Sequence, residues 1–202
     1  MKSKLMWIAP LTLAAGVAFA GDGGYADFKQ MMDHSFKGKG IAEKYRLYQL
    51  DFQKECSGTT LPGKERMAQI EAAQLATVKY PSDGKYLGDW KAGEKVAISG
   101  KGLTWKDKAD AVNGGGCYNC HQLSHTEIAH GTIGPSLKDY GKLRGNSDDI
   151  LKYTWAKIYN AKAFNACSLM PRNGDSGLLT EKQIQDVMAF LLDPESPVNK
   201  AP

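Results

Sequence analysis

Apolar residues recur at three- and four-residue spacing over several stretches of the chain, a pattern typical of amphipathic α-helices. Three such stretches lie in the first half, over residues 25–36, 41–55 and 64–78. A turn at Leu61-Pro62-Gly63 separates the second stretch from the third. The front part of the chain, residues 21–86, is therefore predicted to be helical.

Three more helices are predicted in the second half. One covers residues 89–99 and contains Gly93, which is costly inside a helix unless another element packs closely against it. A second covers residues 147–160. The third begins at Thr180, which forms a capping box with Gln183 and precedes an apolar stripe. The predicted fold class is all-α.

The segments between and after these helices are predicted to be irregular. Residues 140–146 are expected to be a loop. The last seven residues, 196–202, contain two prolines and are expected to form an extended tail.

The first twenty residues have the pattern of a secretory leader. Lys2 and Lys4 precede an apolar stretch from Leu5 to Val17, and Ala18-Phe19-Ala20 is a small-x-small cleavage site. The apolar stretch is too short to span a bilayer comfortably. We therefore expect residues 1–20 to be a signal peptide, removed on export to the periplasm.

Charge and hydropathy exclude some partners. Loss of Lys2 and Lys4 with the leader lowers the formal net charge from +4 to +2, too small an excess to indicate nucleic-acid binding. Outside the leader, no apolar run is long enough for a membrane helix. The expected product is a soluble protein that binds neither nucleic acid nor membrane.

The strongest motif is Cys117-Tyr118-Asn119-Cys120-His121. The spacing C-x-x-C-H is the attachment signature of c-type haem. Each thiol adds across one haem vinyl group, and two intervening residues place both sulfurs along one porphyrin edge. The next residue, His121, then lies under the iron as an axial ligand. We therefore expect one covalent haem c, held by Cys117, Cys120 and His121.

Two other interpretations of this motif remain. A zinc site could use Cys117, Cys120, His125 and His130, but only four residues separate Cys120 from His125, where structural zinc sites usually have about a dozen. A dithiol redox pair would follow an apolar strand, whereas residues 114–116 are three glycines. Both alternatives are weaker than haem attachment.

The second axial ligand is predicted to be Met170. It follows His121 by 49 residues, on a loop between two predicted helices, and Pro171 stiffens that loop. The alternative is a methionine that fills a gap in the core. His125 and His130 follow His121 too closely to reach the opposite haem face, and His34 is expected to be a surface residue.

The remaining cysteines are Cys56 and Cys167. In an oxidising compartment the two are expected to form a disulfide bridge. The alternatives are two unrelated buried thiols, or a reactive thiol, which no constellation of flanking Lys, His or Arg residues supports.

Residues 87–195 resemble a class I cytochrome c, and more narrowly the SoxX family of bacterial sulfur oxidation. The resemblance is carried by the haem motif and the segments 133–137, 159–160, 167–172 and 193–199. The Cys167-to-Met170 spacing and the segment Asp-Pro-Glu-Ser-Pro-Val-Asn are narrower features than C-x-x-C-H. Residues 21–86 are similar to the extension of longer family members.

The resemblance implies the roles of several residues and partners. It implies that the carbonyl of Pro135 accepts a hydrogen bond from the proximal histidine, His121. It implies a monohaem electron-transfer subunit that pairs with a SoxA-like subunit. In that family the partner couples thiosulfate oxidatively to a cysteine of the carrier SoxYZ, and a soluble cytochrome takes the electrons onward.

No residue of this chain can be assigned to the sulfur chemistry, so its expected role is electron transfer without a catalytic residue of its own. Whether the chain counts as part of an enzyme, an L-cysteine S-thiosulfotransferase, depends on that partner. The alternative is a free-standing electron carrier without a catalytic partner.

Overall fold

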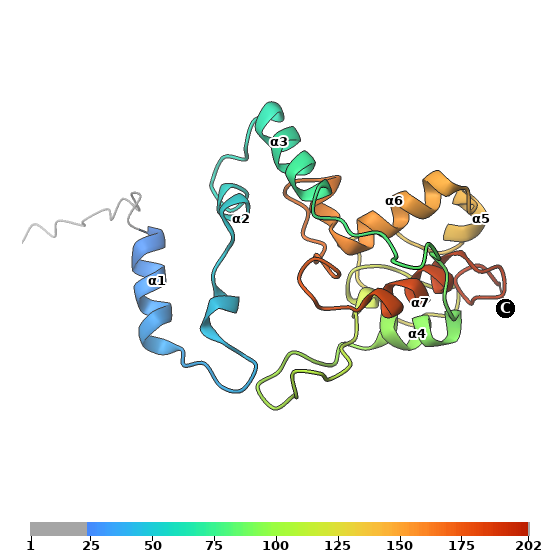
Figure 1. The fold of residues 1–202 in the computed structure, drawn as a ribbon, viewed down its shortest axis with the longest axis horizontal. Helices are drawn as coiled ribbons and strands as arrows, with labels where there is room; N and C mark the ends of the chain where they lie inside the picture. Colours follow the sequence, from blue (N-terminus) through green and yellow to red (C-terminus); the bar gives the residue numbers. More distant parts are fainter. Residues whose placement is uncertain (1–23, 202) are drawn as a thin grey trace, which may run out of the picture. The chain divides into compact units, whose positions relative to one another are not determined.

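The computed structural model describes residues 24–201 and is helical, as the apolar periodicity predicts (Figure 1). The predicted leader, Met1–Ala20, lies outside the described residues. Within them, the only β-type pairing is an isolated bridge between Lys39 and Ala42. The α-helices are α1 (Gly24–Ser35), α2 (Asp51–Glu55), α3 (Lys64–Leu75), α4 (Trp90–Ile98), α5 (Tyr140–Arg144), α6 (Asp148–Tyr159) and α7 (Glu181–Leu192). The 3₁₀-helices are η1 (Lys44–Leu47), η2 (Cys117–Asn119) and η3 (Ala161–Ala163).

The chain divides into two compact units between Lys37 and Gly38. Helix α1 belongs to the first unit. Lys29 forms an ion pair with Asp33 one turn later at 2.8 Å, an arrangement that supports an exposed helix by a few tenths of a kcal/mol. All other elements belong to the second unit.

Helices α4 and α7 cross at close range, and glycine makes the approach possible. A Cβ atom built on Gly93 would overlap the carbonyl oxygen of Asp186 and the Cβ of Phe190. The expected reason for a glycine inside α4 is therefore confirmed. Asp89 caps α4 by accepting a hydrogen bond from the Lys91 amide at 2.8 Å.

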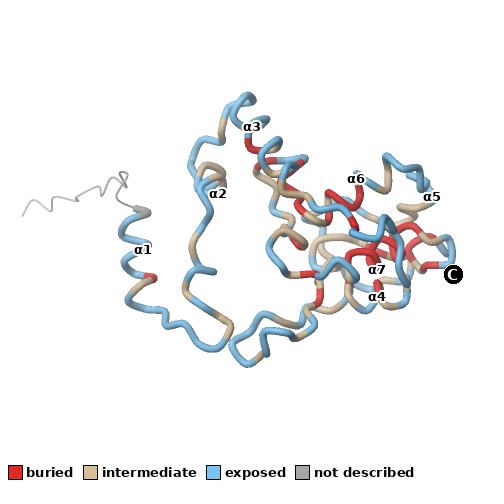
Figure 2. The backbone as a smooth tube through the Cα atoms, in the orientation of Figure 1, coloured by how far each residue is buried: buried red, intermediate tan, exposed pale blue. Residues whose placement is uncertain are grey.

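The core of the second unit lies on α6 and α7, where buried residues are concentrated (Figure 2). Trp155, Ile184, Met188 and Phe190 have almost no exposed surface. The capping box predicted at Thr180 is present, because the Thr180 and Gln183 side chains each bond the other's backbone amide. The apolar stripe of α7 therefore supplies most of one wall of the core.

The C-terminal tail differs from the extended segment that we expected. Residues 194–199 form a series of turns, in which Ser196, Val198 and Asn199 are buried. The Asn199 side-chain amide donates to the carbonyls of Leu191 and Asp193 at the end of α7, and its oxygen accepts from the Gly141 amide at 2.8 Å. Side-chain capping therefore folds the tail back, where the prolines alone suggested extension.

Two further predictions of secondary structure were wrong, one of a helix and one of a loop. Residues 41–55 are not one helix, because η1 and α2 are separated by extended backbone at Tyr48 and Leu50. Tyr45 in this stretch is 70% exposed, so the apolar stripe has little core to pack against and does not sustain a continuous helix. Residues 140–144, expected to be loop, form the short helix α5.

Candidate functional site

The haem motif begins on a short 3₁₀ turn held against α4 by glycine backbone. The amides of Gly115 and Gly116 donate to the carbonyls of Val96 and Ser99, each at 2.8 Å. A Cβ atom on Gly114 would overlap the Ser99 carbonyl oxygen. The three glycines before the motif therefore let the chain lie directly on the end of α4.

His121 is oriented by a hydrogen bond to the loop that follows. Its Nδ1 lies 2.7 Å from the carbonyl oxygen of Pro135. A carbonyl can only accept, so Nδ1 carries a proton, and in the neutral ring Nε2 then has the lone pair. Gly134 provides the room, because a Cβ atom there would overlap the imidazole ring. The neutral tautomer with Nε2 available is the one that an axial ligand requires.

His121 and Met170 line the same cavity, although 49 residues separate them in the sequence. Cys117 also lines it, and the empty volume is about 410 Å³, part of which is open to solvent. The other lining residues are apolar apart from Asn173. The fold therefore brings together one thiol, the imidazole and the thioether that the sequence singled out.

Burial raises the pKa of the Cys117 thiol to about 11. Desolvation is the main cause, because it disfavours the thiolate. A protonated thiol in an apolar pocket is a poor metal ligand and a poor redox nucleophile. The environment of Cys117 therefore does not favour the dithiol interpretation.

The residues present fit a haem. The cavity is apolar, its donors are an imidazole and a thioether, and the side-chain oxygen of buried Asn173 has no hydrogen-bond partner there. Cys117 and Cys120 would hold the group covalently, and His121 and Met170 would be its axial ligands. A haem with these ligands would supply a one-electron couple between ferric and ferrous iron.

The zinc alternative has no donor set in the structure. Among residues 24–201, no three His, Cys, Asp or Glu side chains gather into a group that could hold a metal ion. His125 bonds the carboxylate of Asp139 at 3.0 Å, and His130 is exposed beside the Gly131 carbonyl. Neither histidine lines the cavity, as expected for residues that do not bind the haem.

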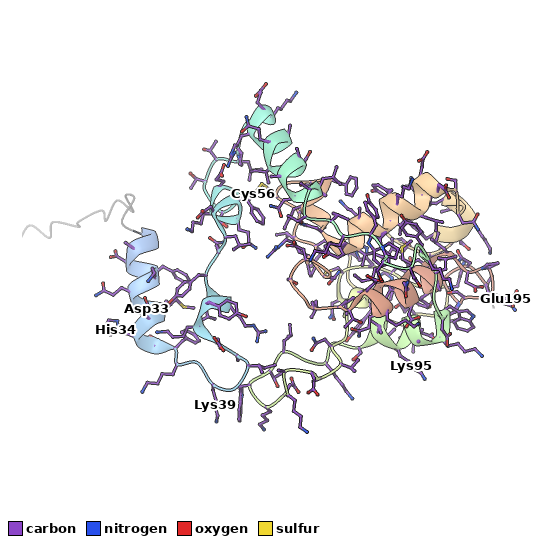
Figure 3. All side chains as sticks on the ribbon, viewed as in Figure 1. Asp33, His34, Lys39, Cys56, Lys95 and Glu195 are labelled. Carbon is purple, nitrogen blue, oxygen red and sulfur yellow. A yellow bond between two sulfur atoms is a disulfide. The ribbon has the colours of Figure 1, made fainter. Side chains whose placement is uncertain are left out.

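The structure joins Cys56 to Cys167 by a disulfide with an S–S distance of 1.99 Å (Figure 3). Cys56 follows α2, and Cys167 lies three residues before Met170. This is the bridge expected from the sequence. It attaches the front part of the chain to the loop that carries the thioether.

A polar residue of the cavity was missed by sequence reasoning. Asn173 follows Met170 by three residues and is 4% exposed. A lone asparagine after a loop methionine indicates only a turn, so no sequence pattern marked it. By contrast, the helical stripe of α7 correctly placed Val187 and Leu191 on the buried side that faces the cavity.

Residues 107–193 match the family model Cytochrome c. This part of the chain is a class I cytochrome c domain. It is the domain of an electron-transfer protein with haem c as cofactor.

The chain is 37% identical to a protein of Aquifex aeolicus (strain VF5) named "Uncharacterized lipoprotein", over 212 aligned residues. The alignment covers 99% of this chain and 100% of the relative. The two proteins therefore belong to one family, and the shared sequence includes the extension as well as the cytochrome c domain. Within the described residues, none of the helices has the length and apolar character needed to cross a membrane.

Proposed function

We propose that this chain is a monohaem electron-transfer cytochrome with His121 and Met170 as axial ligands. The observation that carries the proposal is the cavity that both His121 and Met170 line, together with the Pro135 hydrogen bond, which uses Nδ1 of His121 and leaves Nε2 for a ligand. A thioether is a weak donor to ferric iron and favours the ferrous state. The reduction potential should therefore exceed that of a comparable haem with two histidine ligands.

We further propose that the chain acts as a SoxX-type subunit. The support is the sequence resemblance in residues 167–172 and 193–199. In the reaction expected of the partner, a sulfur–sulfur bond forms between thiosulfate and a carrier thiol. That coupling releases one proton and two electrons, which a monohaem subunit would pass on one at a time.

The proposed location is outside the cytoplasm. The leader pattern of residues 1–20, the Cys56–Cys167 disulfide and the printed name of the Aquifex relative all favour it.

The test combines the native mass with thiosulfate-dependent reduction. The chain should elute from a size-exclusion column, followed by its haem absorbance, in a stable heterodimer with a second haem protein. When the heterodimer is mixed with thiosulfate and a SoxYZ-type carrier, the haem of this chain should become reduced. Leaving out the carrier should abolish the reduction. Elution at the mass of a single chain, with no thiosulfate-dependent reduction, would instead support a free-standing carrier.

A further inference from the structure

The segment of the front part that touches the cytochrome c domain contacts the chain on both sides of Met170. We define the distal loop as residues 164–175. On its N-terminal side, Cys167 is bonded to Cys56, directly after α2. On its C-terminal side, the guanidinium carbon of Arg172 lies 5.7 Å from the ring centroid of Phe52, within α2. The six residues 167–172 are therefore attached at both ends to α2 or to the residue that follows it.

The two ends of the distal loop are held by the domain, because Ala166 is buried and the Gly174 and Asp175 amides donate to the Tyr159 carbonyl. The residues next to Met170 have fewer contacts. Leu169 is 84% exposed, and the Met170 amide bonds only the nearby Ser168 hydroxyl, at 3.2 Å. Downstream, Arg172 pairs with Asp175 inside the loop. Segments with local hydrogen bonds and few buried contacts open at low free-energy cost. The contacts of Cys167 and Arg172 to the α2 segment therefore add restraint where residues 168–171 have little of their own.

Helix α2 is itself anchored. Glu55 in α2 receives two hydrogen bonds from the Arg66 guanidinium in α3, at 2.6 and 2.8 Å. Farther along α3, Glu71 accepts a hydrogen bond from the Ala166 amide of the distal loop at 3.1 Å. Gln74 accepts another from the Asn160 side chain, which follows α6, at 3.0 Å. The anchor thus continues from the distal loop through α2 and α3 to the core.

We propose that α2 is a clamp that keeps Met170 in the haem cavity, with Cys56 and Phe52 as its positioning residues. The proposal rests on the ligation of haem iron by Met170. The function of the front extension would then be to keep the Met170 thioether on the iron and prevent its replacement by another ligand. A clamp of this kind holds the reduction potential of the site constant although Leu169, next to the ligand, is exposed to solvent.

The clamp is tested on the full-length ferric protein with its haem attached. One variant is Cys56→Ser/Cys167→Ser, which removes the bridge and leaves no free thiol to bind iron. A second is Phe52→Ala, which keeps the bridge. Tyr45→Ala serves as the control, because Tyr45 lies in the same extension and is 70% exposed. Phe52→Leu should restore part of the apolar contact.

Two readouts report on Met170 itself. The near-infrared charge-transfer band of sulfur–iron bonding measures how much of the protein has Met170 on the iron. The rate at which added imidazole binds ferric haem measures how often the thioether leaves. The clamp predicts a weaker band and about tenfold or more faster imidazole binding in the bridge variant. Phe52→Ala should give a smaller change in the same direction, and Tyr45→Ala should behave as wild type.

The outcomes separate the clamp from the assignments on which it depends. A normal band and unchanged imidazole rates in both the bridge variant and Phe52→Ala would overturn the clamp and leave Met170 as the ligand. Absence of the band in wild type would overturn the ligation and the clamp together. Neither result depends on thiosulfate or a partner subunit, so the proposed SoxX role is tested separately. If the bridge variant does not fold, the Phe52→Ala and Phe52→Leu pair alone decides the question.

Discussion

His121 depends on two neighbours that the C-x-x-C-H motif does not include. The Pro135 carbonyl fixes the protonated ring nitrogen, and Gly134 leaves space for the ring. The motif was sufficient to mark His121 as the expected haem ligand. The need for glycine at position 134 was not predictable, because it arises from a close approach between segments 13 residues apart.

Gly134→Ala is expected to displace the His121 ring and lower haem incorporation. The added Cβ would overlap the imidazole, which cannot move away without breaking its 2.7 Å bond to Pro135. The measurement is haem per protein chain, from haemochrome absorbance after expression with the attachment machinery. The matched control is Gly100→Ala, because no heavy atom lies within 4 Å of a Cβ there. Equal haem content in the two variants would contradict this account of the site.

At the scale of elements, the crossing of α4 and α7 positions the cavity walls. Ala97 on α4 and Val187 and Phe190 on α7 all line the cavity. The sequence predicted both helices and the reason for Gly93. It did not predict α5 or the break in residues 41–55, because short helices are decided by tertiary contacts more than by their own periodicity.

Gly93→Ala should destabilise the protein by about 2–3 kcal/mol, as overpacking in a tight core does. The added methyl meets the Asp186 carbonyl oxygen, which belongs to helix backbone and cannot rotate away. The measurement is the denaturant concentration at the midpoint of unfolding, compared at an unchanged slope of unfolding free energy against denaturant concentration. Gly100→Ala is again the control. A midpoint equal to that of wild type would show that the contact between α4 and α7 can accommodate the added methyl group.

A pH-dependent contribution is expected at the start of α5. Hydrogen bonding from His125, with Lys142 also nearby, lowers the pKa of the Asp139 carboxyl below its ordinary value of 3.8. A carboxyl with a depressed folded-state pKa stabilises the fold above its unfolded pKa, and this stabilisation is lost as the pH falls through the folded pKa.

Asp139→Asn should therefore be less stable than wild type at pH 6, and the difference should shrink as the pH falls below the ordinary carboxyl range. Asparagine also tolerates the left-handed conformation that Asp139 adopts, with φ of 59°, so the substitution isolates the charge. Thermal unfolding across the pH range provides the measurement. A stability difference that does not change with pH would show that the carboxylate charge is not what matters.

At the scale of the whole molecule, the disulfide connects the front extension to the distal loop. The sequence could only suggest that these two segments are in contact. The bridge spans 111 residues and attaches the extension to the distal loop. Cysteine number and an exported leader favoured the pair. Only the folded structure shows that Phe52 and Glu71 contact the same loop, because these contacts have no sequence signature.

The bridge should resist alkylation in denatured, unreduced protein and become alkylated after reduction. Its removal should lower the free energy of unfolding by about 4–5 kcal/mol in the chain-entropy treatment of a loop of this length. Peptide mass mapping gives the first result, and denaturant unfolding of Cys56→Ser/Cys167→Ser gives the second. Two alkylatable thiols in unreduced protein would contradict the bridge.

The central proposal is that His121 and Met170 would both bind the iron of a single haem. The most direct measurement is the near-infrared charge-transfer band of sulfur–iron bonding in the ferric protein. The account predicts the band in wild type, its loss in Met170→Ala, and its retention in the control Met31→Ala, where the methionine is 48% exposed. A wild-type protein without the band, or a Met170→Ala protein that keeps it, would contradict the claim.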